Sequence, residues 1–290
     1  MYPVVKWVGG KRQLLPVITK MIPEKFGNYF EPFLGGAALY LALEPVNAII
    51  NDVNHQLIGL YNAIKNSPDE FISKLSEYEN GFNNLKNQEE KKQYFYMMRD
   101  QYNTLIQTEK EDIEMYAIMI FLNKSCFNGI YRVNKKGLYN VPFGRKNSIK
   151  ICDENNIRGI SKLLSTAKIT SLDFEAACSG AEEGDFIFFD SPYYGTFDSY
   201  QAGRFSEEDH VRLSKLFKKL SKKGVYCMLT NSNTDFIKNL YKGYRITVVP
   251  VKRMINRDAL NRTGEEIVVT NYSLGIETAI TKNIKATEIL

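Results

Sequence analysis

The sequence predicts an α/β fold in which a sheet of parallel strands is covered by helices on both faces. Three observations support this prediction. Short apolar runs bounded by Gly, Asp or Asn alternate with segments that repeat apolar residues at helical spacing. A glycine-rich turn follows one apolar run and a polar turn with a proline follows another, as is usual where strands end at a ligand site. One long polar segment interrupts the alternation and predicts an inserted helical unit.

Several apolar runs have the length and the boundaries of buried strands. They are Tyr29–Phe33, Ala48–Ile50, Ile169–Leu172, Phe186–Phe189, Val225–Leu229, Ile246–Val251 and Ile267–Val269. Helices are expected between them, first at Lys11–Met21 and then at Leu39–Leu43. A third begins after the acidic segment Ser206–Asp209 and carries apolar residues at helical spacing from Leu213 to Leu220.

The segment Asn66–Phe121 contains no convincing strand and is rich in Asn, Gln, Lys, Glu and Tyr. Phe71, Leu75 and Tyr78 are spaced as on one face of a helix, so this segment is expected to be a helical insertion. The expected organisation is a discontinuous sheet domain at 1–60 and 146–275, an inserted domain at 61–145 and a tail at 276–290.

Composition excludes some classes of protein. The net charge is +5 and the pI is 8.8, so the chain is only mildly basic. The four cysteines form no CxxC pair and the two histidines stand far apart, which argues against a metal centre or a dithiol site. No apolar run approaches the length of a membrane span and no signal peptide is recognisable, so a cytoplasmic protein is expected.

A glycine-rich turn between a strand and a helix marks a possible cofactor site. The segment Glu31–Ala38 contains Gly35 and Gly36, and Asp52 ends the next strand 17 residues after Gly35. Such a turn lets a ligand approach the backbone, and the acid is placed to accept hydrogen bonds from ribose hydroxyls. The pattern favours an adenosine-containing cofactor. The turn lacks the GxGxxG pattern of NAD sites, and a purely structural turn remains an alternative.

The tetrapeptide Asp190-Ser191-Pro192-Tyr193 follows a strongly apolar strand. Pro192 restricts Ser191 to extended backbone, so the Ser191 carbonyl and the Asp190 carboxylate can act as two acceptors. The amino group of a nucleobase has two N–H bonds to satisfy them, and these acceptors would stabilise positive charge developing on that nitrogen. Tyr193 offers a face for stacking an unpaired base. A surface turn is the alternative reading.

With these motifs in order, the chain resembles the Dam-like, D12-class adenine-N6 DNA methyltransferases from about Val4 to Tyr272. Lys6–Lys11 resembles the N-terminal cofactor motif of that family, and Glu31–Gly36 resembles its glycine motif, with Ala37 where a third glycine is usual. The family tetrapeptide is usually Asp-Pro-Pro-Tyr, so Ser191 replaces a proline. Because the acceptor is a backbone carbonyl, activity is expected to survive this replacement.

The resemblance implies a Rossmann-like sheet that binds S-adenosyl-L-methionine, with an inserted DNA-recognition domain. The catalytic residues it implies are Asp190, Ser191, Pro192 and Tyr193. The implied cofactor contacts are Trp7, Gly9, Lys11, Glu31, Phe33, Gly35, Gly36, Asp52, Asp173, Phe174 and Asp190. The reaction implied is methyl transfer to N6 of an adenine flipped out of duplex DNA, with GATC as the expected sequence. A monomer and a cognate restriction endonuclease are also expected.

A basic and aromatic segment between Asn123 and Lys146 is the expected DNA-reading element. Its lysines and arginines alternate with aromatic and amide side chains, which suits phosphate contacts, base-edge hydrogen bonds and a wedge into the base stack. By resemblance, Arg132 would read guanine. The implied DNA contacts are Lys11, Phe127, Asn128, Arg132, Asn134, Pro142, Arg145 and, in a second basic patch, Arg253. A solvated basic loop is the alternative.

Three other functions are compatible with parts of the pattern. A methyltransferase acting on RNA or on a free amine would share the cofactor site without needing a base-reading segment. An NAD-dependent oxidoreductase is supported only by the glycine turn. A DNA-binding module without catalysis is disfavoured because Asp190, Pro192 and Tyr193 are all present.

Overall fold

The computed structural model describes residues 1–7, 9–195, 205–252 and 263–273, apart from the side chains of Arg12, Lys252 and Thr263. A seven-stranded sheet has the order β3-β2-β1-β4-β5-β7-β6. Its strands are β1 (Tyr29–Glu31), β2 (Ala48–Asn51), β3 (Ala167–Thr170), β4 (Phe186–Phe189), β5 (Tyr226–Ser232), β6 (Arg245–Lys252) and β7 (Thr263–Thr270). The predicted α/β sheet is therefore confirmed.

Strand direction departs from the prediction at one place. Strands β3, β2, β1, β4 and β5 pair in parallel, whereas β7 is antiparallel to both β5 and β6. The expectation of a wholly parallel sheet is wrong for β7. Only residues 253–262 separate β6 from β7, and a parallel return needs a crossover of a dozen residues or more.

Helices cover the sheet on both faces. They are α1 (Leu15–Met21), α2 (Ala38–Leu43), α3 (His55–Asn66), α4 (Pro68–Asn83), α5 (Gln88–Gln107), α6 (Ile113–Ser125), α7 (Glu154–Leu164), α8 (Phe174–Ala177), α9 (Glu207–Lys222) and α10 (Asp235–Leu240), with short 3-10 turns η1 (Lys11–Gln13) and η2 (Phe127–Gly129). Strand β4 shows the two faces. Phe186 and Phe188 join one core, while Ile187 and Phe189 join a second core with Leu213 of α9.

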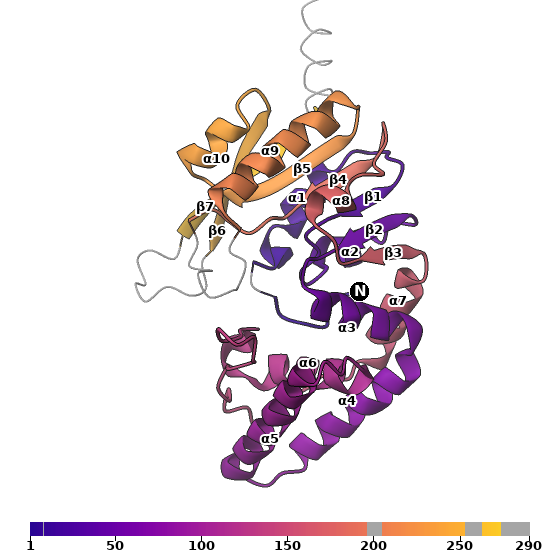
Figure 1. Cartoon of the computed structure of the whole chain (residues 1–290), viewed down its shortest axis with the longest axis vertical. Helices are drawn as coiled ribbons and strands as arrows, with labels where there is room; N and C mark the ends of the chain where they lie inside the picture. Colours follow the sequence, from indigo (N-terminus) through magenta and orange to yellow (C-terminus); the bar gives the residue numbers. More distant parts are fainter. Residues whose placement is uncertain (8, 196–204, 253–262, 274–290) are drawn as a thin grey trace, which may run out of the picture.

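The predicted insertion is helical. Helices α4, α5 and α6 lie together below the sheet in Figure 1, with α3 and α7 between them and the strands. Within the described residues 66–121 there is no strand, as the sequence predicted. After α6 the chain forms an irregular hairpin, held by isolated bridges between Cys126 and Phe143 and between Val133 and Tyr139.

Two boundaries differ from the sequence prediction for clear physical reasons. The helix expected at Lys11–Met21 is divided into η1 and α1, because Pro16 has no N–H to continue a helix and instead lies in the first turn of α1. Strand β3 ends at Thr170 rather than Leu172. The Leu172 amide donates to the Asn51 side chain at 2.8 Å, so it leaves the strand ladder.

Candidate active site

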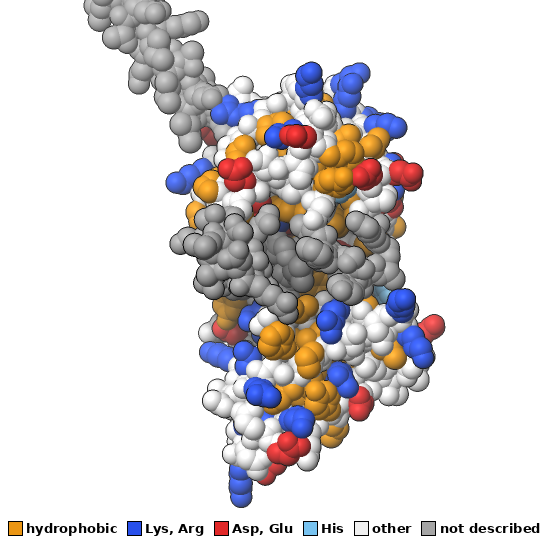
Figure 2. Space-filling model, turned by 90° about the vertical axis from the view of Figure 1, so that its left-hand side faces the viewer, with side chains coloured by type: hydrophobic (Ala, Val, Ile, Leu, Met, Phe, Trp, Pro, Cys, Tyr) orange, Lys and Arg blue, Asp and Glu red, His pale blue; other side chains and the backbone are white. Residues whose placement is uncertain are grey.

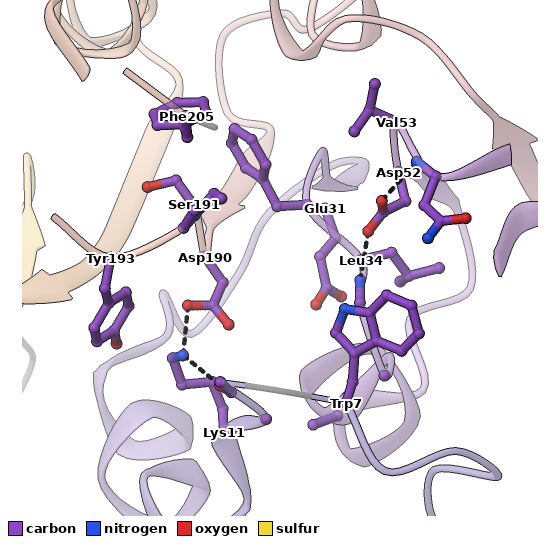
Figure 3. A pocket seen from close by; sticks show the side chains of 18 of the residues that line it. Trp7, Lys11, Glu31, Leu34, Asp52, Val53, Asp190, Ser191, Tyr193 and Phe205 are labelled. Atoms are coloured by element: carbon purple, nitrogen blue, oxygen red, sulfur yellow. Dashed lines mark hydrogen bonds and ion pairs between the residues drawn. The ribbon is translucent and has the colours of Figure 1, made fainter. Parts of the chain in front are cut away.

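A cavity of about 850 Å³ lies beyond the carboxyl ends of β1, β2 and β4, where open α/β sheets place their ligands. Figure 3 shows the glycine turn, the N-terminal segment and the 190–193 tetrapeptide facing this cavity from different elements. The predicted residues that line it are Trp7, Gly9, Lys11, Glu31, Phe33, Gly35, Gly36, Asp52, Asp190, Ser191, Pro192 and Tyr193. Folding thus unites motifs that are far apart in the sequence.

The turn after β1 is fixed by the acid after β2. Asp52 accepts a hydrogen bond from the Gly35 amide at 2.8 Å and another from the Asn54 amide at 2.9 Å. Gly35 has φ +49°, and a Cβ atom there would lie 2.9 Å from the Trp7 ring. Glycine is therefore required both by the backbone conformation and by the close packing of Trp7. Burial raises the pKa of Asp52, while the two backbone hydrogen bonds lower it.

Ala37 occupies the place of the glycine that is usual in the family. It is fully buried and adopts the left-handed conformation, with φ 57° and ψ 31°, directly before α2. Alanine pays roughly 1–2 kcal/mol for this conformation, whereas glycine does not. Alanine therefore replaces glycine at a position whose backbone keeps the conformation that glycine favours.

Glu31 is a buried carboxyl group on the cavity wall. It is only 2% exposed and accepts a hydrogen bond of 2.7 Å from the Tyr29 hydroxyl. Burial, together with the nearby charges of Asp190 and Asp52, raises the pKa of Glu31 to about 8 despite the lowering effect of the hydrogen bond from Tyr29. The neutral and charged forms of this group are therefore both accessible near neutral pH.

Asp190 at the end of β4 forms an ion pair with a buried lysine. The Lys11 ammonium lies 2.6 Å from Asp190 Oδ1 and also donates to the Gly9 carbonyl at 2.7 Å. The Thr230 hydroxyl of β5 donates to the same Asp190 oxygen at 2.7 Å. Lys11 and Thr230 both contact Oδ1 of the carboxylate, so the side chain is held with its second oxygen, Oδ2, beside the cavity (Figure 3).

Ser191 is held through its side chain as well as its backbone. Its hydroxyl is buried, 2% exposed, and accepts a hydrogen bond of 3.2 Å from Asn231 Nδ2. Asn231 Oδ1 in turn accepts from the Tyr194 amide at 3.1 Å. One side chain of β5 therefore holds both Ser191 within the tetrapeptide and Tyr194 directly after it. The sequence assigned no role to this hydroxyl, which in part replaces the stiffness of the missing proline.

The ring of Tyr193 is held at the cavity by charged groups. Its hydroxyl donates to Glu266 of β7 at 2.6 Å, and the Lys11 ammonium lies 4.5 Å from the ring centroid. Burial first, and then the charges of Asp190 and Glu266, raise the pKa of Tyr193 well above its usual value. The phenol therefore stays protonated and keeps its hydrogen bond.

Asp173 and Phe174, which were predicted to contact the cofactor, do not line the cavity in the described structure. Phe174 stacks on Phe33 from behind, with ring centroids 5.5 Å apart. Both oxygens of Asp173 lie within 3.2 Å of Arg212, which also contacts Glu175 and so ties α9 to α8. Phe174 thus packs against a residue of the cavity wall, and Asp173 helps to join α8 to α9.

Most of the predicted DNA-reading residues are exposed to solvent. Those exposed on the hairpin after α6 are Phe127, Asn128, Arg132, Asn134, Pro142 and Arg145. The Arg132 side chain donates to Asn140 at 2.8 Å, which fixes its direction. Lys11, by contrast, is buried beside Asp190, and Arg253 lies outside the described residues. On the face in Figure 2, Lys and Arg side chains recur over the lower half of the molecule, with apolar side chains between them.

Sequence reasoning missed several residues at this site. They are Thr230, Asn231, Glu266, Tyr131 and Phe205. The first two could have been found, because a polar pair after the apolar run of β5 follows the same strand-end rule that identified Asp190. Glu266 follows the exposed Glu265 and precedes the buried run Ile267–Thr270 of β7, and nothing in its local pattern points to Tyr193.

Two negative findings concern only the described part of the chain. No helix there is both long and apolar enough to span a bilayer. No group of three or more His, Cys, Asp or Glu side chains among those residues is arranged to hold a metal ion.

The fold and the site together define an α/β domain with a nucleoside-type turn after β1, an acid after β2 and a polar tetrapeptide after β4. The family model for D12 class N6 adenine-specific DNA methyltransferases matches residues 7–255. The chain therefore belongs to this family, and its mixed seven-stranded sheet agrees with the Rossmann-like fold of S-adenosylmethionine-dependent methyltransferases.

Individual relatives agree with the family assignment. Type II methyltransferase M.MjaIII of Methanocaldococcus jannaschii is 40% identical over 287 residues, covering 93% of this chain and 99% of the relative. Type II methyltransferase M1.LlaDCHI of Lactococcus lactis subsp. cremoris is 40% identical over 278 residues, which cover 93% of this chain and 95% of the relative. The DNA adenine methylase of Haemophilus influenzae is 29% identical over 266 residues and is covered to 90%, as is this chain. The protein is thus an adenine-specific DNA methyltransferase.

Proposed function

We propose that this enzyme transfers a methyl group from S-adenosyl-L-methionine to N6 of an adenine that is flipped out of duplex DNA, at the sequence GATC. The observation that carries the proposal is the position of Asp190 and Tyr193 in the same cavity as the Gly35 turn. An acceptor pair, an aromatic face and a cofactor turn meet there, and N6 methylation needs all three.

The lining of the cavity fits S-adenosylmethionine. Asp52, at the end of β2, is placed for the ribose, while Phe33 and the exposed Val53 supply apolar surface for the adenine ring. Glu31 and the Gly35–Gly36 backbone supply polar groups for the methionine portion. When bound, the cofactor supplies an activated methyl group on a positively charged sulfur. The acidic wall formed by Glu31, Asp52 and Asp190 complements that charge.

The chain's own groups account for activation of the adenine. Asp190 Oδ2 and the Ser191 carbonyl accept the two N6 hydrogens, which turns the nitrogen lone pair toward the methyl donor. Tyr193, held by Glu266, stacks on the extruded base. Asp190 then stabilises the positive charge that develops on nitrogen. No covalent enzyme intermediate is needed.

The hairpin after α6 is the proposed recognition element. Arg132 reads guanine in the major groove, while Phe127 and Asn128 fill the space that the flipped adenine leaves. Arg145 and the basic patch with Arg253 contact phosphates. Residues 61–145 then form the recognition domain, inserted into a catalytic domain of residues 1–60 and 146–275.

The biological setting is also part of the proposal. The enzyme acts as a monomer in the cytoplasm, on DNA of the nucleoid. The type II names of two relatives support a partner restriction endonuclease of the same specificity.

Sequencing of methylated bases in DNA from cells that express the protein tests this function most directly. We expect N6-methyladenine at GATC, and a different motif would overturn the specificity while leaving the chemistry. A panel of duplexes and matched RNAs distinguishes the main alternative. Labelling of RNA alone would contradict the DNA assignment, and tight NAD binding without response to S-adenosylmethionine would contradict the cofactor. The logarithm of the DNA association constant should fall linearly with the logarithm of the salt concentration, because phosphate contacts release counterions.

A further inference from the structure

Asn123, in the last turn of α6, joins the recognition hairpin to the N-terminal segment of the cavity. It is 1% exposed. Its Oδ1 accepts a hydrogen bond from the Lys6 amide at 2.7 Å, and its Nδ2 donates to the Lys6 carbonyl at 2.9 Å and to the Gly129 carbonyl at 3.2 Å. Both hydrogens of the amide are therefore used, one on each of two separate segments.

Of the two segments that Asn123 joins, one contributes to the cavity and the other to the exposed turn of the hairpin. Lys6 precedes Trp7, whose ring lines the cavity, packs on Gly35 and stacks on Tyr131 at 5.3 Å. Gly129 ends the turn whose exposed residues, Phe127 and Asn128, are the proposed wedge in DNA.

A second contact reinforces this connection. Gly129 has φ +66°, and a Cβ atom there would lie 2.5 Å from the Lys6 side chain. The turn and the N-terminal segment are therefore in direct contact.

We infer that Asn123 is a positioning residue that couples DNA engagement at the 127–129 turn to the cofactor cavity through Lys6 and Trp7. The inference rests on the proposed function. When DNA fixes the turn, the bonds of Asn123 fix the Lys6 backbone and thereby the Trp7 ring against the Gly35 turn. Coupling of this kind is reciprocal, so bound cofactor must also favour DNA binding by the same factor.

The chain offers a matched control in Asn103 of α5. Its side chain makes the same double contact with the backbone of Tyr139, accepting at 2.8 Å and donating at 3.1 Å. Asn103 therefore anchors the same hairpin, and within the described residues its side chain bonds only to Tyr139 and not to the N-terminal segment. If anchoring alone mattered, Asn103 and Asn123 would be equivalent.

The test measures the dissociation constant of S-adenosylhomocysteine for the full-length protein by calorimetry, with and without a GATC duplex. In the wild type, DNA should tighten binding by a factor within the usual range of about 5–150. We define the coupling ratio as the dissociation constant of S-adenosylhomocysteine without DNA divided by that with DNA. Asn123→Ala should bring this ratio close to one, while the protein still binds each ligand alone. Asn103→Ala should weaken DNA binding and keep the ratio. Equal loss of the ratio in both variants, or its retention in Asn123→Ala, would overturn the inference.

Hydrogen exchange on the wild type covers the case in which Asn123→Ala does not fold. DNA without cofactor should slow exchange of the amides of residues 4–7. Unchanged exchange there, or a wild-type ratio of one, would refute the coupling. Either result is distinguishable from failure of the proposed function, which would appear as absence of methyl transfer to DNA.

Discussion

The catalytic corner (Asp190–Tyr193) and the proposed recognition hairpin after α6 hold their side chains in opposite ways. At the corner, the side chains of Asp190, Ser191 and Tyr193 are each held by a partner on β5 or β7. On the hairpin, the backbone is held while side chains such as Phe127 and Arg145 are exposed. Chemistry at a fixed nitrogen needs acceptors that do not move. Reading DNA needs side chains that can exchange solvent for bases and phosphates.

The backbone of the hairpin is held largely by amide side chains beneath it. Asn103 binds the N–H and C=O of Tyr139, Asn123 donates to the Gly129 carbonyl, and Asn83 binds the N–H and C=O of Ile149 just after the hairpin. Such contacts satisfy backbone groups that no regular ladder pairs. The hairpin can therefore be well placed although it contains only isolated bridges. Four predictions test this contrast, from the largest expected effect to the smallest.

Removal of the acceptor at the corner should have the largest effect. Asp190→Ala should abolish methyl transfer while preserving cofactor binding and most DNA affinity, because the acceptor acts on charge that develops during transfer. Asp190→Asn keeps the shape and should lower the single-turnover rate by about 10²–10³-fold, as loss of such a preorganised group usually does. Substantial transfer by either variant would remove Asp190 from the mechanism.

On the hairpin, Arg132→Ala should reduce discrimination rather than chemistry. Loss of a bidentate contact to guanine costs about 1–3 kcal/mol, so preference for GATC over a duplex with that guanine changed should fall by roughly 10–100-fold. The rate at saturating cognate DNA should change little. As a control, Lys135→Ala should weaken all duplexes equally. Unaltered preference in Arg132→Ala would show that another residue reads this base.

The buried corner should also respond to pH through Glu31. Its pKa is about 8 in the fold and 4.5 in the unfolded chain. The neutral carboxyl therefore stabilises the ligand-free fold below pH 4.5, and this stability is lost as the pH rises to about 8, by at most about 1.4 kcal/mol per pH unit. Urea unfolding from pH 5 to 8 should give a shallower slope for Glu31→Gln than for the wild type. Arg132→Ala should keep the wild-type slope, and identical slopes in all three proteins would contradict the buried titration.

The smallest effect should come from the hydroxyl of Ser191. Ser191→Ala leaves the buried Asn231 amide without its partner, which costs about 1 kcal/mol and should lower kcat by roughly fivefold while KM for the cofactor is unchanged. Ser179→Ala removes an exposed hydroxyl at the end of α8 and serves as the control. Equal rates for Ser191→Ala and the wild type would mean that Pro192 alone sets the carbonyl.

Much of the catalytic region could be predicted from sequence because it obeys local rules. Strong apolar runs predicted β1, β2 and β4, and the polar residues after each run predicted the edge of the sheet at which the cavity lies. The helix start at Ser206 also followed its pattern, since Ser206 and Asp209 form a reciprocal capping box. In these places the local sequence pattern was enough to predict the element.

The remaining features depend on contacts between distant residues. The pairing of Tyr193 with Glu266 joins residues on two elements, and the pairing of Lys11 with Asp190 joins residues 179 positions apart in the sequence. No local pattern predicts such partners. The reversal of β7 likewise depends on the length of the chain after β6, which the apolar spacing of the strand does not reveal.

The place of the insertion between β2 and β3 has a consequence for folding. Strand β3 can pair with β2 only after a segment of about 115 residues has been made and its ends brought together. Relative to a 15-residue connection, closure of this loop costs about 2 kcal/mol more in chain entropy. Helices α4, α5 and α6 reduce that cost if they assemble first, because α3 and α7 pack together at the ends of the insertion. Assembly of the helical unit before the sheet would therefore lower the entropy cost of adding β3 beside β2.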